Sequence, residues 1–344
     1  MTRAPTLPHV PPTTTPQREI DTDSAFARHV AEGLRAERAY LSSRFIYDER
    51  GSRIFQEIMR LDAYYLTRCE FEILEREAER LVSTFAGPDD APFELVELGA
   101  GDGTKTKLLL RAALRQNRRC TYRPVDISGD ILEVLGDSLR AELPELRFEP
   151  IAASYDEALA RLAEAPRDGT RRVVLFLGSN IGNFGFAAAR AFCGRVCAAL
   201  RPGDLFLLGV DLRKNPRTIR EAYDDPEGVT ARFNLNLLHR LRRELGAEVD
   251  PGTWGFYPLY NPETGEVRSY LHPLSPEGAR IRIPALGFDR RFDAGEVIHT
   301  EVSRKYSRAE LDALAAGGDC DVADVLTDAG GRFADVLWER RGGG

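Results

Sequence analysis

The chain has 344 residues, of which 43% are hydrophobic and 29% charged, and its formal net charge is -7. At this length a single hydrophobic core has usually stopped growing, so we expect two domains or one elaborated domain. The negative balance leaves no basic footprint for nucleic acid, and no run is apolar enough to span a membrane. The N-terminus has no apolar signal segment, and five scattered cysteines argue against a disulfide framework, so a cytoplasmic protein is indicated.

The N-terminal part is expected to contain a tail, a helix and an aromatic-rich segment. Residues 1–20 hold five prolines before any hydrophobic period begins, which predicts a disordered tail. Over residues 23–41, Phe26, Val30 and Leu34 recur every four positions, as one face of a helix requires. Aromatic residues crowd the stretch that follows, so it is expected either to pack a cap or to line a pocket.

The sequence LVELGAGDGTKTK, residues 95–107, reads as a strand, a glycine turn and the start of a helix. An apolar run ends at Leu98, glycines follow at 99, 101 and 103, and leucines resume at helical spacing. Glycine allows positive φ and close approach of a ligand, and the first helical turn offers free N–H groups. The pattern indicates a nucleotide-type pocket, although a tight turn without a ligand explains many such matches.

Strands and helices alternate after this turn, which is typical of a parallel sheet. CTYRPVDIS is expected to be a second strand ending at Asp126, with a helix after it, and LRFEPIAASY a third strand. RRVVLFLGSNIGNF reads as a buried fourth strand, and LFLLGVDL after Pro-Gly-Asp as the fifth. Between these two, a helix through Phe192 carries Cys193 and Cys197, whose spacing favours buried packing over a metal site.

From about Lys214 the pattern changes. A long helical stretch is expected over YDDPEGVTARFNLNLLHRLRREL, then antiparallel strands with a hairpin at Glu263-Thr264-Gly265, one more helix and a last hairpin. We therefore predict an α/β domain over residues 71–213 and a second, α+β domain made of residues 21–70 and 214–341. The second domain would face the carboxyl ends of the parallel strands, where open α/β sheets bind ligands.

Two ligand classes compete for the glycine turn. Dinucleotides favour G-x-G-x-x-G with an acidic residue about 20 positions further on. This chain has Thr104 at the third glycine position, Glu97 just before the turn, and no P-loop lysine pattern. With Asp126 at the end of the second strand, where it could accept both ribose hydroxyls, the pattern favours S-adenosylmethionine. The alternative role for Asp126 is a simple helix or turn cap.

Several segments taken together resemble one protein family. They are FIYDERGSRIFQEIMRLDAYYLTRCE, VELGAGDGTKTKLLL, PVDIS, LFLGSNIGNF, LRPGDLFLLGVDL, AYDDPEGVTARFNLNLL and HTEVSRKYS. In this order, from about residue 20 to 340, they resemble the class I methyltransferases and, among these, the histidine-specific N-alpha-methyltransferases of ergothioneine biosynthesis. The resemblance implies a Rossmann-like parallel sheet that binds S-adenosylmethionine, plus a second α+β domain that binds the substrate.

The resemblance also implies a set of cofactor-binding residues. These are Tyr47, Gly99, Lys105 and Asp126, with Ser154 and Tyr155 near the adenine. The family more often has an aspartate where this chain has Ser154. Without the resemblance, Lys105 would be read as an ordinary solvated lysine at the start of a helix.

For an amino-acid substrate, the resemblance assigns the carboxylate and the amine to Tyr64, Asn183 and Tyr223, the residues expected at the reacting centre. Gly178 and Phe55 would complete the wall. Hydroxyl and amide donors can bind a carboxylate without a cation that would repel the incoming sulfonium. Each of these tyrosines alone would more often be a half-buried packing residue.

The side-chain end of the substrate is assigned to Glu301 and Ser303. They lie two apart in a predicted strand, so both side chains point to one face. This pair suits an imidazole, with Glu301 accepting from one ring N–H and Ser303 contacting the other nitrogen. The simpler alternative is a solvated strand face. Where the best-known family members have a methionine against the imidazole this chain has Ser269, and it has Asn180 in place of a threonine, so the preferred side chain stays open.

The expected chemistry asks little of the protein. A sulfonium is an activated methyl donor, so catalysis is chiefly in-line alignment of a neutral amine. A free amine titrates near ~8, and burial beside a sulfonium lowers its pKa, so no dedicated base is needed. We predict N-methylation of free L-histidine to its trimethyl betaine, hercynine, by a cytoplasmic monomer without a metal. The alternatives are another amino acid or amine, and a non-catalytic homologue that binds the cofactor or a metabolite.

Overall fold

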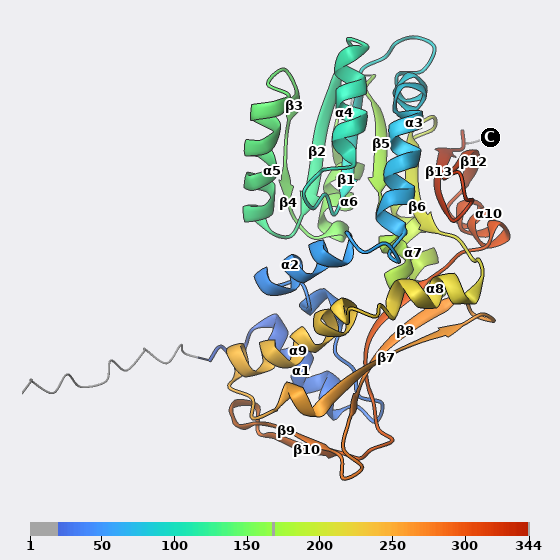
Figure 1. The fold of residues 1–344 in the computed structure, drawn as a ribbon. Coiled ribbons are helices and arrows are strands. Elements are labelled where there is room, and N and C mark those ends of the chain that lie inside the picture. Colours follow the sequence, from blue (N-terminus) through green and yellow to red (C-terminus); the bar gives the residue numbers. More distant parts are fainter. Residues whose placement is uncertain (1–19, 167–168, 343–344) are drawn as a thin grey trace, which may run out of the picture.

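The computed structural model describes residues 20–166 and 169–342, which Figure 1 shows as two stacked parts. The upper part, the α/β unit, contains α3 (Leu66–Ala86), β1 (Phe93–Leu98), α4 (Thr106–Arg115), β2 (Cys120–Asp126), α5 (Gly129–Glu142), β3 (Arg147–Phe148), β4 (Ile151–Ala152), α6 (Tyr155–Glu164), β5 (Arg171–Phe176), η2 (Asn180–Asn183), α7 (Phe186–Ala198), β6 (Leu205–Asp211), α10 (Arg308–Gly317), β12 (Cys320–Thr327) and β13 (Phe333–Arg340). The lower part, the cap unit, contains α1 (Ala25–Arg35), η1 (Ser43–Phe45), α2 (Glu49–Ile58), α8 (Pro216–Tyr223), α9 (Val229–Leu245), η3 (Pro251–Thr253), β7 (Trp254–Asn261), β8 (Glu266–Pro273), β9 (Ala279–Ile283), η4 (Pro284–Leu286), β10 (Phe288–Phe292) and β11 (Ile298–Arg304). The expected tail, residues 1–20, lies outside the described residues except for Ile20.

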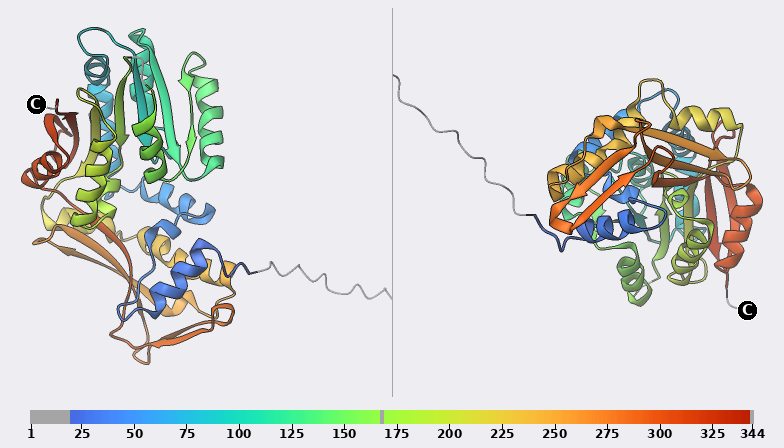
Figure 2. Two further views of the ribbon diagram at one scale, coloured as in Figure 1. Left: turned by 180° about the vertical axis from the view of Figure 1, so that it is seen from behind. Right: turned by 90° about the horizontal axis from the view of Figure 1, so that it is seen from below.

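The α/β unit is built on one large sheet. Its strands lie in the order β12-β13-β6-β5-β1-β2-β3, with β4 beside β2. β1 pairs in parallel with β2 and β5, and β5 pairs in parallel with β6. The chain moves outward from β1 on one side and continues at β5 on the other, so the carboxyl ends of β1 and β5 flank a topological switch point. These ends face the cap unit in Figures 1 and 2.

Helices cover both faces of this sheet because its central strands are apolar on both sides. Successive residues of β1 enter opposite cores, since Leu95 is buried with α3 and α4, and Val96 with α6 and α7. Every residue of β1 and β6 is buried. Such continuous burial is what a parallel sheet sandwiched between helices requires.

Two elements differ from their expected forms. LRFEPIAASY makes two short strands, β3 and β4, which both pair with β2. Pro150 lies between them and has no N–H to donate, so the ladder is interrupted there. The first helix ends at Arg35 rather than near residue 41, because the Leu41 N–H bonds to the His299 carbonyl at 2.8 Å and joins β11.

The final hairpin belongs to the large sheet. β13 pairs antiparallel with β6, and β12 pairs antiparallel with β13. The sequence expectation grouped this hairpin with residues 214–341 in the second domain, whereas the fold adds it to the α/β unit. A hairpin after a helix carries no local signal for the sheet it will join, and β13 covers an otherwise open edge of β6.

The cap unit has its own core and two small antiparallel sheets. One sheet has the order β11-β8-β7, and the other pairs β9 with β10. The predicted hairpin at Glu263-Thr264-Gly265 joins β7 to β8, and the predicted long helix is α9, which packs against α2 and β7. Phe26, Val30 and Leu34 of α1 are buried in this core, as their spacing predicted.

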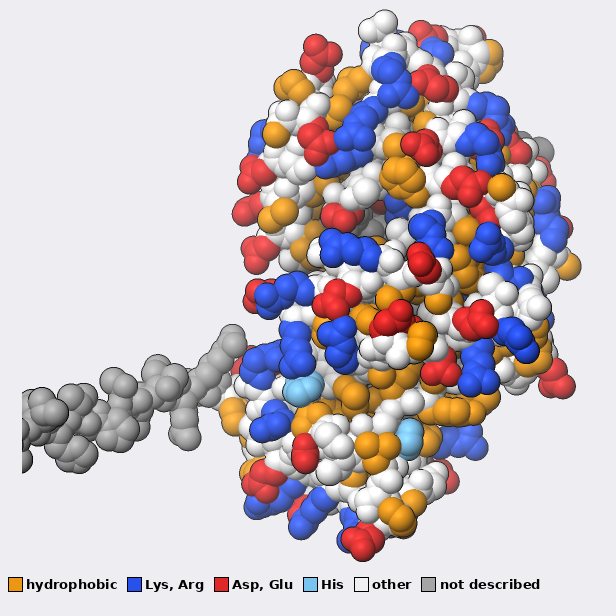
Figure 3. All heavy atoms as spheres, viewed as in Figure 1, with side chains coloured by type: hydrophobic (Ala, Val, Ile, Leu, Met, Phe, Trp, Pro, Cys, Tyr) orange, Lys and Arg blue, Asp and Glu red, His pale blue; other side chains and the backbone are white. Residues whose placement is uncertain are grey.

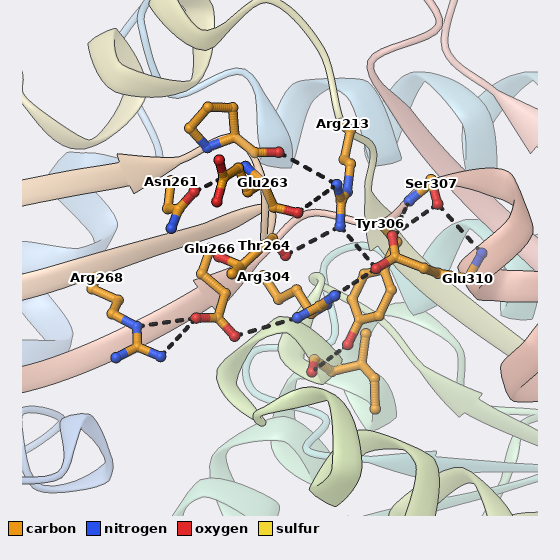
Figure 4. Close-up of polar contacts among 12 residues, drawn as sticks. Arg213, Asn261, Glu263, Thr264, Glu266, Arg268, Arg304, Tyr306, Ser307 and Glu310 are labelled. Carbon is orange, nitrogen blue, oxygen red and sulfur yellow. Dashed lines mark hydrogen bonds and ion pairs between the residues drawn. The ribbon is translucent and has the colours of Figure 1, made fainter.

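A group of charged side chains, the junction cluster, joins the two units (Figure 4). Its members are Arg213, Glu266, Arg304 and Glu310. Arg213, which follows β6, donates to Glu310 of α10 at 2.8 Å. It also donates to three carbonyls of the β7–β8 turn, those of Pro262 at 3.4 Å, Glu263 at 3.3 Å and Thr264 at 3.1 Å. Arg304, at the end of β11, pairs with Glu310 and with Glu266, so both β8 and β11 are fastened to the α/β unit.

Charged side chains of both signs are interspersed over the face of the molecule in Figure 3. Over residues 20–166 and 169–342, no helix combines the length and apolar character that crossing a membrane needs.

Candidate active site

The glycine turn follows β1 at the edge of the sheet that faces the cap unit. Gly99, Gly101 and Gly103 have φ of 77, 55 and 66°, all in the left-handed region. A Cβ on Gly99 would lie 2.5 Å from the hydroxyl oxygen of Tyr155, so a larger residue would force a shift. A Cβ on Gly101 would meet nothing within 4 Å, so the backbone there is open to a ligand.

Glu97 supports this turn from below. Its buried carboxylate accepts hydrogen bonds from the Thr106 hydroxyl, at 2.7 Å, and from the Tyr122 hydroxyl. Burial raises the pKa of Glu97 to about 7 despite the opposing effect of these two bonds. Glu97 therefore ties β1 and β2 to the first turn of α4, and its side chain lies beneath the turn.

Asp126 and Tyr155 lie beside the glycine turn. Asp126 ends β2, and its Oδ1 accepts the Ser128 N–H at 3.0 Å, which fixes the orientation of the carboxylate. Tyr155 begins α6 with its hydroxyl against Gly99. Burial, assisted by the charge of Asp126, raises the pKa of Tyr155 to about 12, so its hydroxyl stays neutral.

Ser154 is engaged as a helix cap. Its hydroxyl donates to Glu157 Oε2 at 2.8 Å and accepts a hydrogen bond from the Glu157 N–H at 3.4 Å. The backbone N–H of Ser154 also donates to Glu157 Oε2. This capping box accounts for the position of Ser154 without a ligand. Its role near the adenine stays a prediction.

Lys105 links the glycine turn to the loop after β5. Its ammonium pairs with Glu70 of α3, and the other oxygen of Glu70 accepts the Gly178 N–H at 2.7 Å. Burial favours the neutral amine, but the Glu70 carboxylate outweighs it and raises the pKa of Lys105 above its usual value. Lys105 is thus a cation fixed by an ion pair with Glu70 and not a freely solvated lysine.

One pocket is lined by residues of both units. It contains these predicted site residues: Tyr47, Phe55, Tyr64, Gly178, Asn183, Tyr223, Glu301 and Ser303. Further lining residues are Ile58, Leu66, Ser179, Asn180, Ala222, Thr230 and Phe233. Tyr47, which the resemblance assigned to the cofactor, therefore lies among the residues assigned to the substrate.

Aromatic rings form much of this wall. Tyr47 packs edge-on against Phe55 and Phe233, with ring centroids 5.4 and 5.2 Å apart. Tyr64 meets Phe55 and Tyr223 in the same edge-on manner, both at 6.3 Å. Burial raises the pKa of the Tyr64 and Tyr223 hydroxyls well above the usual range, so they are neutral donors. Tyr47 exposes 42% of its surface and forms the open rim of the wall.

β11 presents Glu301 and Ser303 to the pocket on one face, as their alternation predicted. The strand bulges between His299 and Glu301, and the pairing with β8 is regular from Glu301 to its end. Burial raises the pKa of Glu301 to about 7, and the nearby Lys305 opposes this rise. Ser303 Oγ lies 2.9 Å from Tyr223 Oη. The pair therefore faces an enclosed pocket and not a solvated strand face.

Ser269 lies opposite Glu301 in β8 and is buried. Its carbonyl accepts the Thr300 hydroxyl at 3.2 Å. Ser269 thus pairs with Glu301 across the two strands, and it is not one of the described residues that line the pocket. Its contact with a substrate side chain stays a prediction.

The loop after β5 brings two amides to the pocket. Gly178 and Ser179 have successive left-handed backbones, with φ of 78 and 57°. Ser179 is held there because its hydroxyl accepts the Asp211 N–H at 3.0 Å. Left-handed non-glycine residues are strained and concentrate at functional sites. The loop enters η2, which carries Asn180 and Asn183 into the wall.

Comparison with known proteins identifies the family of the chain. Residues 26–340 match the family described as histidine-specific, S-adenosylmethionine-dependent methyltransferases. The chain belongs to this family. Two histidine N-alpha-methyltransferases, from Mycolicibacterium smegmatis and Mycobacterium tuberculosis, are 34% and 35% identical over 309 residues, 90% of this chain and 93% of each relative. Ergothioneine biosynthesis protein 1 of Schizosaccharomyces pombe is 29% identical over 286 residues, 82% of this chain and 36% of that protein.

The predicted fold class and enzyme class of this histidine-specific methyltransferase are confirmed. The fold is the class I methyltransferase arrangement, a Rossmann-like parallel sheet with an added α+β unit. The enzyme is an S-adenosylmethionine-dependent amino-acid N-methyltransferase with a small-molecule substrate.

The residues around the glycine turn fit S-adenosylmethionine. The open backbone at Gly101 leaves room for a ligand, and Asp126 offers a carboxylate at the adjoining strand end. Ile127, the next residue, exposes 82% of its surface, which gives an apolar surface for an adenine ring. Sequence reasoning did not select Ile127, and its position after Asp126 was the only signal.

Lys305 was also missed. It is fully buried beside the pocket, and its ammonium contacts Tyr223, Ser303 and Asp211. The period of two that paired Glu301 with Ser303 continues to position 305, so the same alternation was an available signal.

Proposed function

We propose that the enzyme transfers methyl groups from S-adenosylmethionine to the α-amino nitrogen of free L-histidine, up to the trimethyl betaine hercynine. The observation that carries this proposal is the pairing of Glu301 and Ser303 on one face of β11 in an enclosed pocket. No hydrogen bond from the described residues reaches the Glu301 side chain, so it is free to accept from a ligand. A carboxylate and a hydroxyl together match the two nitrogens of an imidazole.

The amino-acid end of the substrate is assigned to Tyr64, Asn183 and Tyr223. All three line the same pocket as Glu301 and Ser303. Neutral phenol and amide groups can bind and orient a carboxylate and an amine without changing charge themselves. The cofactor is assigned to Gly99, Lys105, Asp126 and Tyr155, where the open turn and the adjacent carboxylate support binding.

Bound S-adenosylmethionine supplies an activated methyl group on a sulfonium. The residues of the chain then have to hold a neutral amine in line with it. The positive sulfonium beside the amine disfavours an ammonium ion and so lowers the pKa of the bound amine. Asn183 and Tyr64 are the candidates that orient its lone pair, and no separate base is required.

The aromatic wall supports repeated methylation. Each transfer makes the nitrogen larger and more apolar. The first two leave an ammonium that loses a proton to solvent before the next transfer, and the last one gives a permanent positive charge. Aromatic faces attract quaternary ammonium groups, with about 0.5–2 kcal/mol for each well-placed ring. The rings of Tyr47, Phe55, Tyr64, Tyr223 and Phe233 gather at this pocket. They suit the trimethylated product as well as the free amine.

One alternative is another amino acid as the preferred substrate. Asn180 lines the pocket and adds a polar amide to the wall, and Ser269 stands behind Glu301. Incubation of the protein with labelled S-adenosylmethionine and a panel of free amino acids, read by mass, separates the two. A gain of three methyl groups on histidine alone is the expected result, and methylation of a different amino acid instead would overturn the histidine assignment.

Replacement of Glu301 by alanine tests the substrate pocket. We expect the variant to lose about 10- to 100-fold in kcat/KM for histidine, because a hydrogen bond to a charged group is removed. Cofactor affinity, measured by calorimetry, should stay unchanged. Glu263→Ala is the matched control, because Glu263 lies exposed in the β7–β8 turn of the same sheet. Unchanged histidine turnover in Glu301→Ala would contradict the pocket assignment.

The remaining proposals concern organisation and location. We propose that residues 71–213 bind the cofactor and that residues 21–70 with 214–305 bind the substrate side chain, in a cytoplasmic monomer. Size-exclusion chromatography with light scattering tests the monomer, and a mass near twice 38.3 kDa would contradict it.

A further inference from the structure

Lys305 lies directly behind two hydroxyls of the substrate pocket. Its side chain is fully buried, and its Nζ donates to Tyr223 Oη at 2.6 Å and to Ser303 Oγ at 2.8 Å. On its other side it pairs with Asp211 at 3.0 Å. Tyr223 and Ser303 line the pocket, so the ammonium acts on the pocket through them.

We propose that Lys305 is a positioning residue that leaves the Tyr223 hydroxyl as a donor to the substrate and thereby selects substrates with a free α-carboxylate. The inference rests on the proposed function of the pocket and deepens it, because it concerns the class of substrate. Lys305 does not touch the substrate itself.

Hydrogen-bond counting supports this role. A hydroxyl has one hydrogen to donate and two lone pairs to accept with. Lys305 occupies one lone pair on each oxygen, and the 2.9 Å contact between Tyr223 and Ser303 uses one of their two hydrogens. One hydroxyl hydrogen is therefore left for a ligand in the pocket. On Tyr223 this hydrogen can be donated to the substrate carboxylate.

The charges around Asp211 point the same way. Asp211 accepts from Tyr65 at 2.9 Å and pairs with two lysines, Lys305 and Lys214. Two ammonium groups thus share one buried carboxylate. Of the two, Lys305 is the one that contacts Tyr223, whose ring centroid is 4.5 Å from its nitrogen. Its ammonium therefore favours a carboxylate over a neutral amide as the acceptor of the Tyr223 hydroxyl hydrogen.

Lys214 gives a matched control for the charge. It contacts the same Asp211 and is also nearly buried, but its other contacts are Tyr65 and the Leu212 carbonyl. Lys305→Met and Lys214→Met each remove one ammonium from Asp211. Only the first removes a hydrogen bond to the pocket hydroxyls.

The test measures binding of L-histidine and L-histidinamide to the full-length protein by calorimetry, together with kcat/KM for both. We expect Lys305→Met to weaken the binding of histidine and lower its kcat/KM by about 10- to 100-fold, because a charge-assisted hydrogen bond is lost. For histidinamide both should change by less than about 3-fold. Lys214→Met should keep the wild-type preference for histidine. Equal losses for both ligands, or the same loss of preference in Lys214→Met, would overturn the proposal.

A second measurement leaves Lys305 in place and serves if Lys305→Met does not fold. Tyr223→Phe, Ser303→Ala and the double variant form a cycle for histidine binding. Because the two hydroxyls are held as one unit, we expect the double loss to differ from the product of the single losses by about tenfold. Independent losses would contradict the proposal. If the wild-type protein does not methylate histidine, the proposed function is wrong. If the wild-type protein methylates histidine and Lys305→Met binds and methylates it equally well, only the role of Lys305 is wrong.

Discussion

Glu97 and Glu301 show how the same side chain serves different purposes: Glu97 is buried, and Glu301 is partly exposed in the pocket. Burial raises the pKa of both Glu97 and Glu301 to about 7. Glu97 accepts bonds from Thr106 and Tyr122, so its polar atoms are satisfied within the fold. Glu301 receives no such bond from the described residues and faces the pocket. A partly exposed carboxylate without a donor from the described residues is open to a donor on a ligand.

Replacement of Glu301 by glutamine should stabilise the ligand-free protein as the pH rises. The folded pKa of about 7 lies above the unfolded value of 4.5, so the folded state binds the extra proton and ionisation costs stability between these values. We expect the advantage of the variant to grow by about 1–2 kcal/mol between about pH 5.5 and about pH 8.5. Urea unfolding at both pH values measures it. A difference that stays constant with pH would show that folding does not raise the pKa of Glu301.

At the scale of elements, the glycine turn joins β1 to α4 through backbone shapes that other residues resist. Gly99 combines a left-handed backbone with the adjacent Tyr155 hydroxyl, whereas Gly101 has the left-handed backbone alone. These two costs can therefore be separated. Gly99 donates its N–H to the Val125 carbonyl at 2.9 Å, which ties the turn to the end of β2 next to Asp126.

Alanine at position 99 should destabilise the protein more than alanine at position 101. We expect about 1 kcal/mol for Gly101→Ala, from the backbone, and about 2–4 kcal/mol for Gly99→Ala, from the backbone and the clash together. Tyr155→Phe in the Gly99→Ala background should recover part of the loss, because the next ring atom is 3.5 Å from the added Cβ. Chemical unfolding without cofactor provides the values, and equal losses at both glycines would refute the steric argument.

At the scale of the whole molecule, the pocket exists only because the two units are held together. Asn180 and Asn183 come from the α/β unit, and Glu301 and Ser303 from the cap unit. The junction cluster fixes the end of β11 and the β7–β8 turn against α10 (Figure 4). The Tyr306 hydroxyl adds a bond to the Ile181 carbonyl at 3.1 Å, which ties the chain after β11 to η2.

Loss of the junction should affect the substrate more than the cofactor. Arg213→Ala removes the bonds to the β7–β8 turn and to Glu310, so we expect kcat/KM for histidine to fall about tenfold through misplacement of β11. Affinity for S-adenosylmethionine, held by the α/β unit, should change by less than about threefold. Arg280→Ala is the control, since Arg280 pairs with Asp289 between β9 and β10 of the cap unit, outside the junction cluster. A larger loss in cofactor affinity than in histidine turnover would contradict this division.

The sequence by itself determined the parts whose signal is local. Continuous apolar runs identified the parallel strands, the spacing of Phe26, Val30 and Leu34 identified a buried helix face, and alternation put Glu301 and Ser303 on one side of a strand. The order of motifs identified the family and, through it, most residues of the pocket. These features depend on the period of a helix or strand, or on residues close together in the chain.

The tertiary structure decided what depends on contacts between distant segments. Pro150 split the third strand because it could not donate to the neighbouring ladder, and the final hairpin joined β6 because that edge was open. Tyr47 lines the substrate pocket because its ring packs against Phe55 and Phe233. Lys305 became a candidate only when Asp211, Tyr223 and Ser303 were brought around it. Burial and charge at such a point are sums over many chain segments, so no single stretch of sequence contains them.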